Sequence, residues 1–399
     1  MTAAGTNKMS AYMDNAAATR PDPRVVEAMT PYIGEFYANP SGLYGPGQRV
    51  KEAVEEARAR VADLIGATPK EIIFTAGGSE ANNLAVKGLS AAQAKKGRHI
   101  VVSAIEHFSV LQAAKRLADD GWGVTYVPVD EDGRVDPAAV EAALREDTVL
   151  VSIMHANSEV GTIEPISAIS EIVRERSIVF HTDAVATTGT IPVSVDDLGI
   201  DALSLSGNQF HGPAGAGALY VRKRTRLRPL IDGGIQEGGR RAGTENVAAI
   251  VGLGKAAELA KAEMAERAAT MTRLRDRLIS GLTGTIERSK LNGHPTDRLP
   301  GNVHIRIEYI EGESMLIMLD MAGISAASGS ACTSRALKAS HVLTAMGVPK
   351  EKIHGSLLFS LSHENTATEV DYVIETLPPI VERLRAMSPL AHDAAAHGA

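Results

Sequence analysis

Short runs of aliphatic and β-branched residues alternate with helical patterns from about residue 48 to residue 221. Alternation of this kind is typical of βαβ units and of a mainly parallel sheet. Between residues 48 and 66, apolar residues recur at helical spacing and Gly66 provides a stop, so we expect a helix there. We expect strands at residues 72–75, 100–103, 124–127, 149–153, 178–180 and 216–221.

The pattern changes after Asn246. A helical stretch rich in Ala and Glu runs over residues 247–284, and strand character returns at residues 301–306. We therefore expect a second, smaller domain that begins inside the long helix. The predicted division is a large α/β domain at 17–256, and a small domain formed by 1–16 together with 257–399.

Composition narrows the class of protein. The 399 residues are 44% hydrophobic and 22% charged, and the formal net charge is −7, which offers no basic field for nucleic acid or for an anionic membrane. No apolar run approaches the roughly 20 residues that span a bilayer, and the first residues lack the apolar core of a signal peptide. We expect a cytoplasmic protein with neither kind of partner. The single cysteine, Cys332, excludes an intrachain disulfide.

Candidate chemistry follows the predicted strands, where open α/β sheets bind ligands. Residues 75–80 form a glycine turn into a helix that suits a phosphate, although a plain turn capped by Ser79 explains it as well. His107 could stack on a flat ring or move a proton, and Asp183 could pair with a protonated pyridine nitrogen. Taken singly, Asn157 and Asp183 are equally well explained as turn residues.

The order of these segments resembles the cysteine desulfurase family of pyridoxal phosphate enzymes. The resemblance covers nearly the whole chain and includes residues 13–19, 39–41, 212–215, 236–246, 328–334, 340–343 and 368–371. It implies a homodimer of fold-type I subunits. Each would have a mainly parallel, seven-stranded sheet sandwiched by helices, and a smaller α+β C-terminal domain.

The resemblance also implies roles for individual residues. The phosphate of the cofactor would be bound by Gly78, Ser79 and Ser206, with Thr244 reaching across from a second subunit. His107 would stack on the ring, Asp183 would pair with the pyridine nitrogen and Asn157 would lie near the phenolic oxygen. Cys332 would be the nucleophile that carries sulfur as a persulfide to an acceptor protein.

Several positions depart from the family pattern. Gln209 stands where the family has the lysine that binds the cofactor covalently, and Asn208 stands where it has a histidine. His363 aligns with the arginine that holds the carboxylate of substrate cysteine, and Ala186 aligns with a glutamine beside the cofactor. A carboxamide can neither form an imine nor act as a titratable base. The chain would therefore bind pyridoxal or pyridoxamine phosphate only non-covalently, and ordinary desulfuration would be absent or very weak.

Three hypotheses follow. In the first, the chain serves sulfur transfer or iron–sulfur assembly, with Cys332 accepting persulfide sulfur or contributing a ligand to a cluster shared with a scaffold protein. In the second, it is an enzyme that uses a non-covalent cofactor on another substrate, with His107 or His211 moving the proton. In the third, it is an inert structural partner. Light absorption by added cofactor would separate the second hypothesis from the other two.

Overall fold

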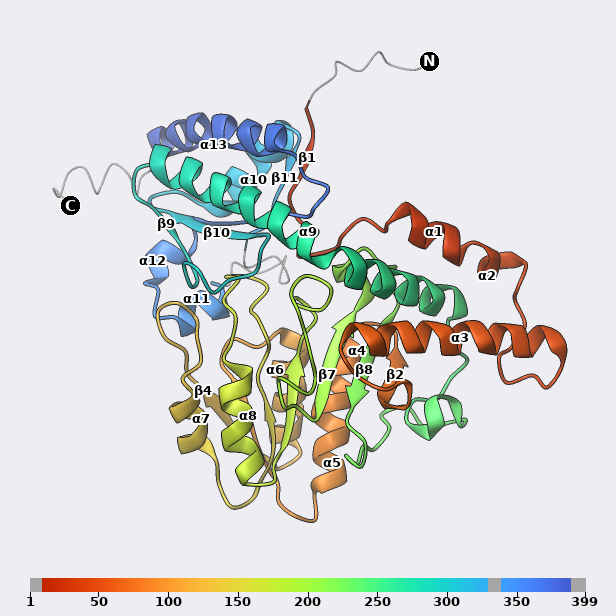
Figure 1. Cartoon of the computed structure of the whole chain (residues 1–399). Coiled ribbons are helices and arrows are strands. Elements are labelled where there is room, and N and C mark those ends of the chain that lie inside the picture. The colour runs from red at the N-terminus through yellow and green to blue at the C-terminus, as the bar shows by residue number, and fades with distance from the viewer. Residues whose placement is uncertain (1–8, 329–338, 389–399) are drawn as a thin grey trace.

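The computed structural model describes residues 9–328 and 339–388. Its largest sheet has seven strands in the order β2-β8-β7-β6-β5-β3-β4, and the pairs on either side of β8 are antiparallel while all others are parallel. The predicted mainly parallel sheet of seven strands is confirmed (Figure 1). The strands are β2 (Ile72–Thr75), β3 (His99–Ser103), β4 (Gly123–Val127), β5 (Thr148–Ser152), β6 (Val179–Asp183), β7 (Ala202–Ser206) and β8 (Gly217–Val221).

Six of these strands lie within about one to three residues of the predicted ranges. The seventh, β7, was not predicted, although it is a central strand that pairs with β6 and β8. Five of the strands are buried along their whole length, which is expected because helices cover both faces of such a sheet.

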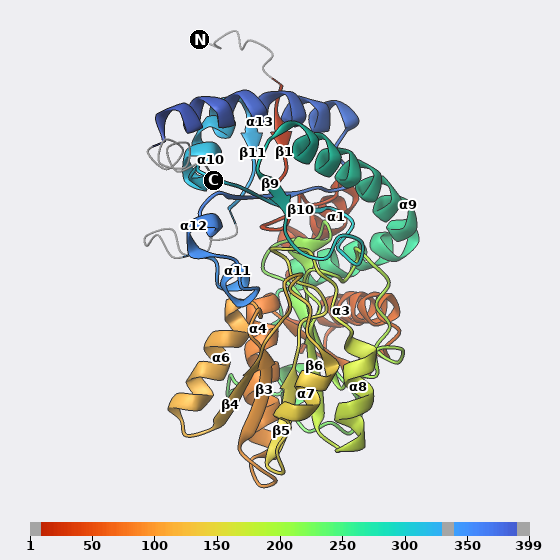
Figure 2. The same cartoon turned by 90° about the vertical axis from the view of Figure 1, so that its left-hand side faces the viewer.

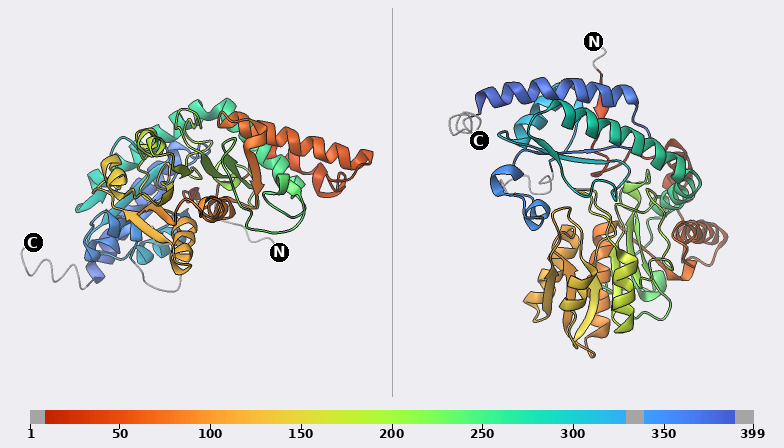
Figure 3. Two further views of the ribbon diagram at one scale, coloured as in Figure 1. Left: turned by 90° about the horizontal axis from the view of Figure 1, so that it is seen from below. Right: turned by 60° about the vertical axis from the view of Figure 1, so that its left-hand side comes forward.

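Helices cover both faces of the large sheet. One face packs against α3 (Gly45–Leu64), α7 (Pro137–Ala143), α8 (Ile166–Glu175) and the first part of α9 (Val247–Thr285). The other face packs against α4 (Gly78–Asn83), the π-helical turn that follows it (Leu84–Leu89) and α6 (Phe108–Asp119). A short α5 (Ser90–Gln93) continues that helix. The view from below in Figure 3 shows these layers end on.

A separate core surrounds a second sheet. This antiparallel sheet has the order β12-β10-β9, and a parallel pair joins β1 to β11. The elements are β1 (Ala11–Tyr12), β9 (Ser289–Leu291), β10 (Asn302–Ile307), α10 (Gly312–Met321), β11 (Ile324–Ser325), β12 (Ser356–Ser360) and α13 (Ala367–Met387). Their apolar side chains form one cluster with the second half of α9, and α13 lies beside that half of α9 (Figure 2).

The long helix α9 connects the two cores. Its buried alanine, isoleucine and leucine residues up to Ala260 belong to the core of the large sheet, and its buried leucines from Leu274 onward belong to the core of the small sheet. The helix is one continuous element of 39 residues. The domain boundary between residues 256 and 257 remains a prediction. It falls inside this helix, which contributes to both cores.

The remaining helices are short. They are α1 (Pro23–Met29) and α2 (Pro31–Gly34) near the N-terminus, and α11 (His341–Ala345) and α12 (Lys350–Ile353) before β12. Within the described ranges, no helix is long and apolar enough to cross a membrane.

Candidate active site

A cavity of about 650 Å³ opens at the carboxyl edge of the large sheet. Parallel strands end there, so side chains that follow different strands are brought together. Residues that are far apart in the sequence share its wall, and they include six of the predicted site residues: Gly78, Ser79, His107, Asp183, Ser206 and Gln209.

The carboxylate of Asp183 is held rigidly at this cavity. It is 5% exposed, and its oxygens accept hydrogen bonds from the Asn82 side-chain amide (2.6 Å) and the Val185 N–H (2.9 Å). Burial raises the pKa of Asp183, while the two hydrogen bonds and the nearby His107 oppose that rise. A cationic group of a ligand placed here would gain a fixed, partly desolvated partner.

A short hydrogen-bond chain connects Asp183 to His107. The Asn82 amide also donates to the hydroxyl of Ser109 at 2.9 Å, and that hydroxyl lies 2.7 Å from Nδ1 of His107. The Ser109 N–H donates to the same Nδ1 at 3.1 Å. Nδ1 is therefore engaged by both the hydroxyl and the N–H of Ser109. The ring of His107 is therefore oriented by Ser109 and Asn82, two residues that the sequence analysis did not single out.

The glycine turn before α4 forms another wall of the cavity. Gly77 has φ of +149°, a conformation that favours glycine. A Cβ on Gly78 would lie only 2.7 Å from a methyl group of Val185. Opposite the turn, the Ser206 hydroxyl donates to the side-chain oxygen of Asn208 at 2.6 Å. Small residues thus keep this wall open.

Gln209 lines the cavity next to the N-terminal arm, residues 11–19. Its side-chain amide donates to the carbonyl oxygens of Ala16 (3.0 Å) and Ala17 (3.5 Å). Nearby, the Thr19 hydroxyl donates to the Asn208 carbonyl at 3.0 Å. Residues 208 and 209 therefore help to hold the arm over the cavity.

Asn157 lies beside the large cavity. It is 2% exposed and lines an adjoining space of about 160 Å³, which shares His107, Met154 and Ser158 with the 650 Å³ cavity. Its amide nitrogen donates to the Ile105 carbonyl at 3.0 Å, and its oxygen accepts from the N–H groups of the two residues that follow Ser158, both at 2.9 Å. These bonds close the turn after β5. The predicted place of Asn157 near the phenolic oxygen of the cofactor stays a prediction.

The structure does not place two of the predicted site residues at this cavity. Thr244 is exposed and lies outside the residues that line this cavity, so its predicted reach into a second subunit stays a prediction. Cys332 lies outside the described residues. Within 9–328 and 339–388, there is no group of three or more His, Cys, Asp or Glu side chains that could hold a metal ion.

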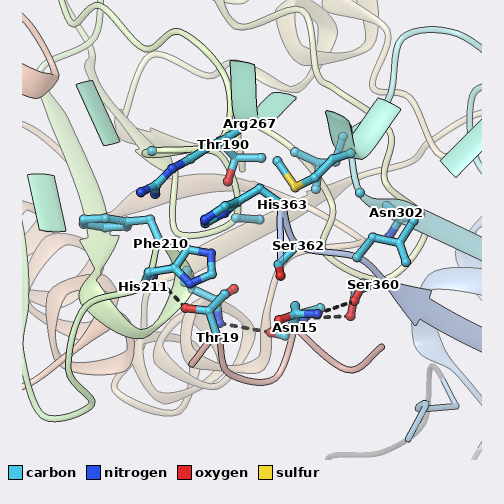
Figure 4. Close-up of a pocket in the computed structure, with 18 of the residues that line it drawn as sticks. Asn15, Thr19, Thr190, Phe210, His211, Arg267, Asn302, Ser360, Ser362 and His363 are labelled. Carbon is cyan, nitrogen blue, oxygen red and sulfur yellow. Dashed lines mark hydrogen bonds between the residues drawn. The ribbon is translucent and has the colours of Figure 1, made fainter. Parts of the chain in front are cut away.

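A smaller compartment of about 70 Å³ adjoins the cavity. The two share Ala16, Ser158, Ala186 and Gln209. Figure 4 shows the rings of His211 and His363 next to each other in this compartment; their centroids are 4.5 Å apart and their planes are inclined by 70°. His363 therefore lies beside the cavity. Such a position is expected of a residue that the resemblance aligns with the arginine for the substrate carboxylate.

Both imidazoles are kept neutral. Burial, together with the positive charge of Arg267, lowers the pKa of His363 to about 4. Burial also lowers the pKa of His211, whose backbone has a left-handed φ of +65°. Arg267 lines the same compartment although it was not predicted as a site residue, since an arginine on a helix is ordinarily a surface residue.

The sheet order and the cavity at its carboxyl edge are those of pyridoxal phosphate fold type I, and a family model described as "Aminotransferase class-V" matches residues 11–373. "Cysteine desulfurase IscS" of Methanosarcina thermophila is 54% identical over 385 residues, covering 96% of this chain and 95% of the relative. "Cysteine desulfurase IscS 1" of Archaeoglobus fulgidus is 50% identical over 379 residues, with coverage of 95% and 99%.

Comparison with solved structures indicates the same family. A structure titled "NIFS-LIKE PROTEIN" superposes with a TM-score of 0.89 at 39% identity and covers 94% of this chain and 100% of that chain. The apo structure of the cysteine desulfurase from Thermococcus onnurineus NA1 gives a TM-score of 0.84 at 26% identity, with coverage of 94% and 95%. The chain therefore belongs to the cysteine desulfurase family of class-V aminotransferases.

Proposed function

We propose that this protein acts in sulfur transfer but does not carry out ordinary pyridoxal phosphate-dependent desulfuration of cysteine. The observation that carries the proposal is the carboxamide of Gln209 at the cavity wall, in the position where the family has its lysine. An amide forms no imine and takes no proton near neutral pH, so covalent binding of the cofactor and general-base catalysis both lose their residue. General-base catalysis alone typically raises the rate of a reaction about 10²- to 10⁴-fold.

The cavity still fits the cofactor of the family. Its volume of about 650 Å³ accommodates a substituted pyridine with its phosphate. Asp183 would pair with the ring nitrogen, His107 would stack on the ring, and the turn at Gly78 and Ser79 would bind the phosphate together with Ser206. Asn157 would lie near the phenolic oxygen, next to Ser158, which lines the cavity. When bound, the ring supplies an electron sink. Binding would be non-covalent, for pyridoxal or pyridoxamine phosphate.

The sulfur itself would be carried by Cys332. Its thiolate would accept persulfide sulfur made elsewhere, or would serve as a ligand of an iron–sulfur cluster shared with a scaffold protein. The working unit would be a homodimer, with Thr244 of the partner subunit completing the phosphate site. Cytoplasmic location, and the division into domains at 17–256 and at 1–16 with 257–399, belong to the same proposal.

A second candidate function is favoured by one observation. The chain of hydrogen bonds from Asp183 through Asn82 and Ser109 to His107 orients a carboxylate and an imidazole toward the cavity. A purely structural partner has no use for such an arrangement. An enzyme that uses a non-covalent cofactor on a substrate other than cysteine would use both groups, with His107 or His211 moving the proton.

Mass spectrometry of the purified protein tests the first function. After incubation with a low-molecular-weight persulfide, we expect one sulfur atom to be added to Cys332, and none in the Cys332→Ser control. After incubation with pyridoxal phosphate and L-cysteine, we expect no release of alanine and no added sulfur. Sulfide release from L-cysteine by the unmodified chain, at the rate of ordinary relatives, would overturn the proposal.

A further inference from the structure

We propose that the compartment around His211 and His363 receives an uncharged group, so that the site prefers small primary amines to α-amino acids as the amine part of its ligand. This inference rests on the proposed binding of a pyridoxal-type cofactor in the adjoining cavity. It concerns the substrate class of that site, which the proposed function leaves open.

The position of the compartment determines which part of a ligand it meets. Gln209, Ser158 and Ala186 belong to the walls of both spaces. A ligand whose aromatic ring occupies the larger cavity can therefore extend a substituent past Gln209 into the smaller one. With about 70 Å³ available, the smaller space has room for a substituent of only a few atoms.

The two imidazoles offer no positive charge to that substituent. The Nδ1 of His211 lies 2.8 Å from the Arg20 carbonyl oxygen, so Nδ1 carries the proton and Nε2 presents a lone pair. The pKa of His363 is about 4, so this ring is also neutral near pH 7. From the two imidazoles, a carboxylate placed here would receive at most the one neutral N–H of His363, and it would also meet the lone pair of His211. The other polar side chains of the wall are uncharged hydroxyls and amides, apart from Arg267.

Arg267 does not supply the missing charge. Among the described residues, it is the one lysine or arginine that lines this compartment, and it pairs with Glu263 at 2.6 Å and with Asp22 at 3.7 Å. The pKa of both carboxyls is lowered to about 2, so both are ionised. Arg24 contacts the same two carboxylates, each at 2.7 Å.

These four side chains have no net charge, since two arginines balance two carboxylates. A ligand carboxylate would add a third negative group to the cluster. It would also lose its hydration without gaining a dedicated cation, which is unfavourable for a buried ion. Apolar wall residues, among them Phe210, Met271 and Leu299, instead suit a short uncharged group.

Two inert conjugates test the inference on the full chain. Reductive amination of pyridoxal phosphate with S-trityl cysteamine and with S-trityl-L-cysteine, followed by removal of the trityl group, gives stable secondary amines that differ by one carboxylate and need no lysine. The sulfur is protected because a free thiol would close onto the aldehyde carbon as a thiazolidine. We expect isothermal titration calorimetry at pH 7.5 to show that the cysteamine conjugate binds about ten- to a hundredfold more tightly. His363→Arg should reverse the preference, while His354→Arg, at an exposed position outside both walls, should leave it unchanged.

The outcomes separate the two proposals. Equal binding of the conjugates, or tighter binding of the L-cysteine conjugate, would overturn the selectivity for amines but leave the cofactor cavity intact. Failure of both conjugates to bind would overturn the cofactor cavity and the selectivity together. The comparison on the unmodified chain does not depend on the variants, so a poorly folded His363→Arg protein would not rescue the inference.

Discussion

The side-chain amide of Gln209 donates a hydrogen bond to the carbonyl oxygen of Ala16, at 3.0 Å. This contact joins the segment that follows β7 to the N-terminal arm, and it lies where the large cavity meets the smaller compartment. The amide is thus part of a packed junction at the position that the resemblance aligns with the family's lysine. Both the proposed loss of ordinary desulfuration and the retained cavity follow from this position.

Replacing Gln209 with lysine should restore covalent binding of the cofactor. The new amine would reach the same cavity, and its amine can form an imine where an amide cannot. We expect Gln209→Lys protein incubated with pyridoxal phosphate to keep a visible absorption band after gel filtration, whereas the unmodified chain loses it. Gln209→Asn is the matched control and should behave like the unmodified chain. Retention of the band by the control would contradict the prediction.

The lysine alone should not restore desulfuration of cysteine. His363 remains neutral near pH 7 because its pKa is about 4, so it cannot replace a bidentate cation for the substrate carboxylate. We expect alanine production from L-cysteine in Gln209→Lys/His363→Arg protein to exceed that of Gln209→Lys by about tenfold or more, mainly through a lower KM. Equal rates in the single and double variants would show that His363 is not limiting.

Removing the buried carboxylate of Glu237 should strongly destabilise the fold. Its two oxygens accept from Arg58 at 2.7 and 2.8 Å and from the Phe74 N–H at 2.9 Å. Glu237→Ala leaves the Arg58 charge and a strand N–H buried without this partner, at a cost of about 3–5 kcal/mol. Glu55→Ala removes an exposed partner of the same arginine and should cost less than about 1 kcal/mol. Urea denaturation measures both.

The buried carboxyl of Glu159 should make stability fall as the pH rises. Burial raises the pKa of Glu159 to about 8, whereas the unfolded value is about 4.3. The folded chain therefore holds one more proton between these values, and its stability declines with rising pH until about pH 8. One proton corresponds to about 1.4 kcal/mol per pH unit.

Glu159→Gln keeps an oxygen that can accept the Ser340 hydroxyl but cannot titrate. We measure its free energy of unfolding in urea between pH 5 and pH 8. With rising pH this free energy should fall less steeply than that of the unmodified chain, and the difference in slope should correspond to about one proton. Glu175→Gln, at an exposed helical position, serves as the control and should keep the original slope. The same slope in both variants would contradict the assignment.

The strands of the large sheet were largely predictable from local patterns, with β7 as the exception. The segment Ala202–Ser206 alternates apolar residues with serine, and serine is not among the residues enriched in strands. In the structure, the hydroxyl of Ser204 lies 3.0 Å from the Nε2 of His181 on β6. A partner on a neighbouring strand therefore compensates for burying the hydroxyl, and no local pattern carries that information.

Asn157 shows a similar limit within the site. The sequence indicated a polar turn after β5, but not which groups its side chains bond. Asn157 bonds backbone groups at three positions, and it lines a space that adjoins the large cavity. One of its partners, the Ile105 carbonyl, lies 52 residues earlier in the chain, so no local pattern carries that information.

Periodicity and motif order were sufficient for the class of fold, the long helix α9 and most of the residues around the cavity, because these depend on local hydrophobic patterns and on residues that follow successive strands. The electrostatic character of the smaller compartment depended on folding. Arg267 lies on α9, Asp22 precedes α1 and His363 follows β12, and electrostatic interactions among such groups are strong only at distances of a few ångströms. Only the packing of these three segments places Arg267 beside the neutral His363 and decides that carboxylates balance its charge.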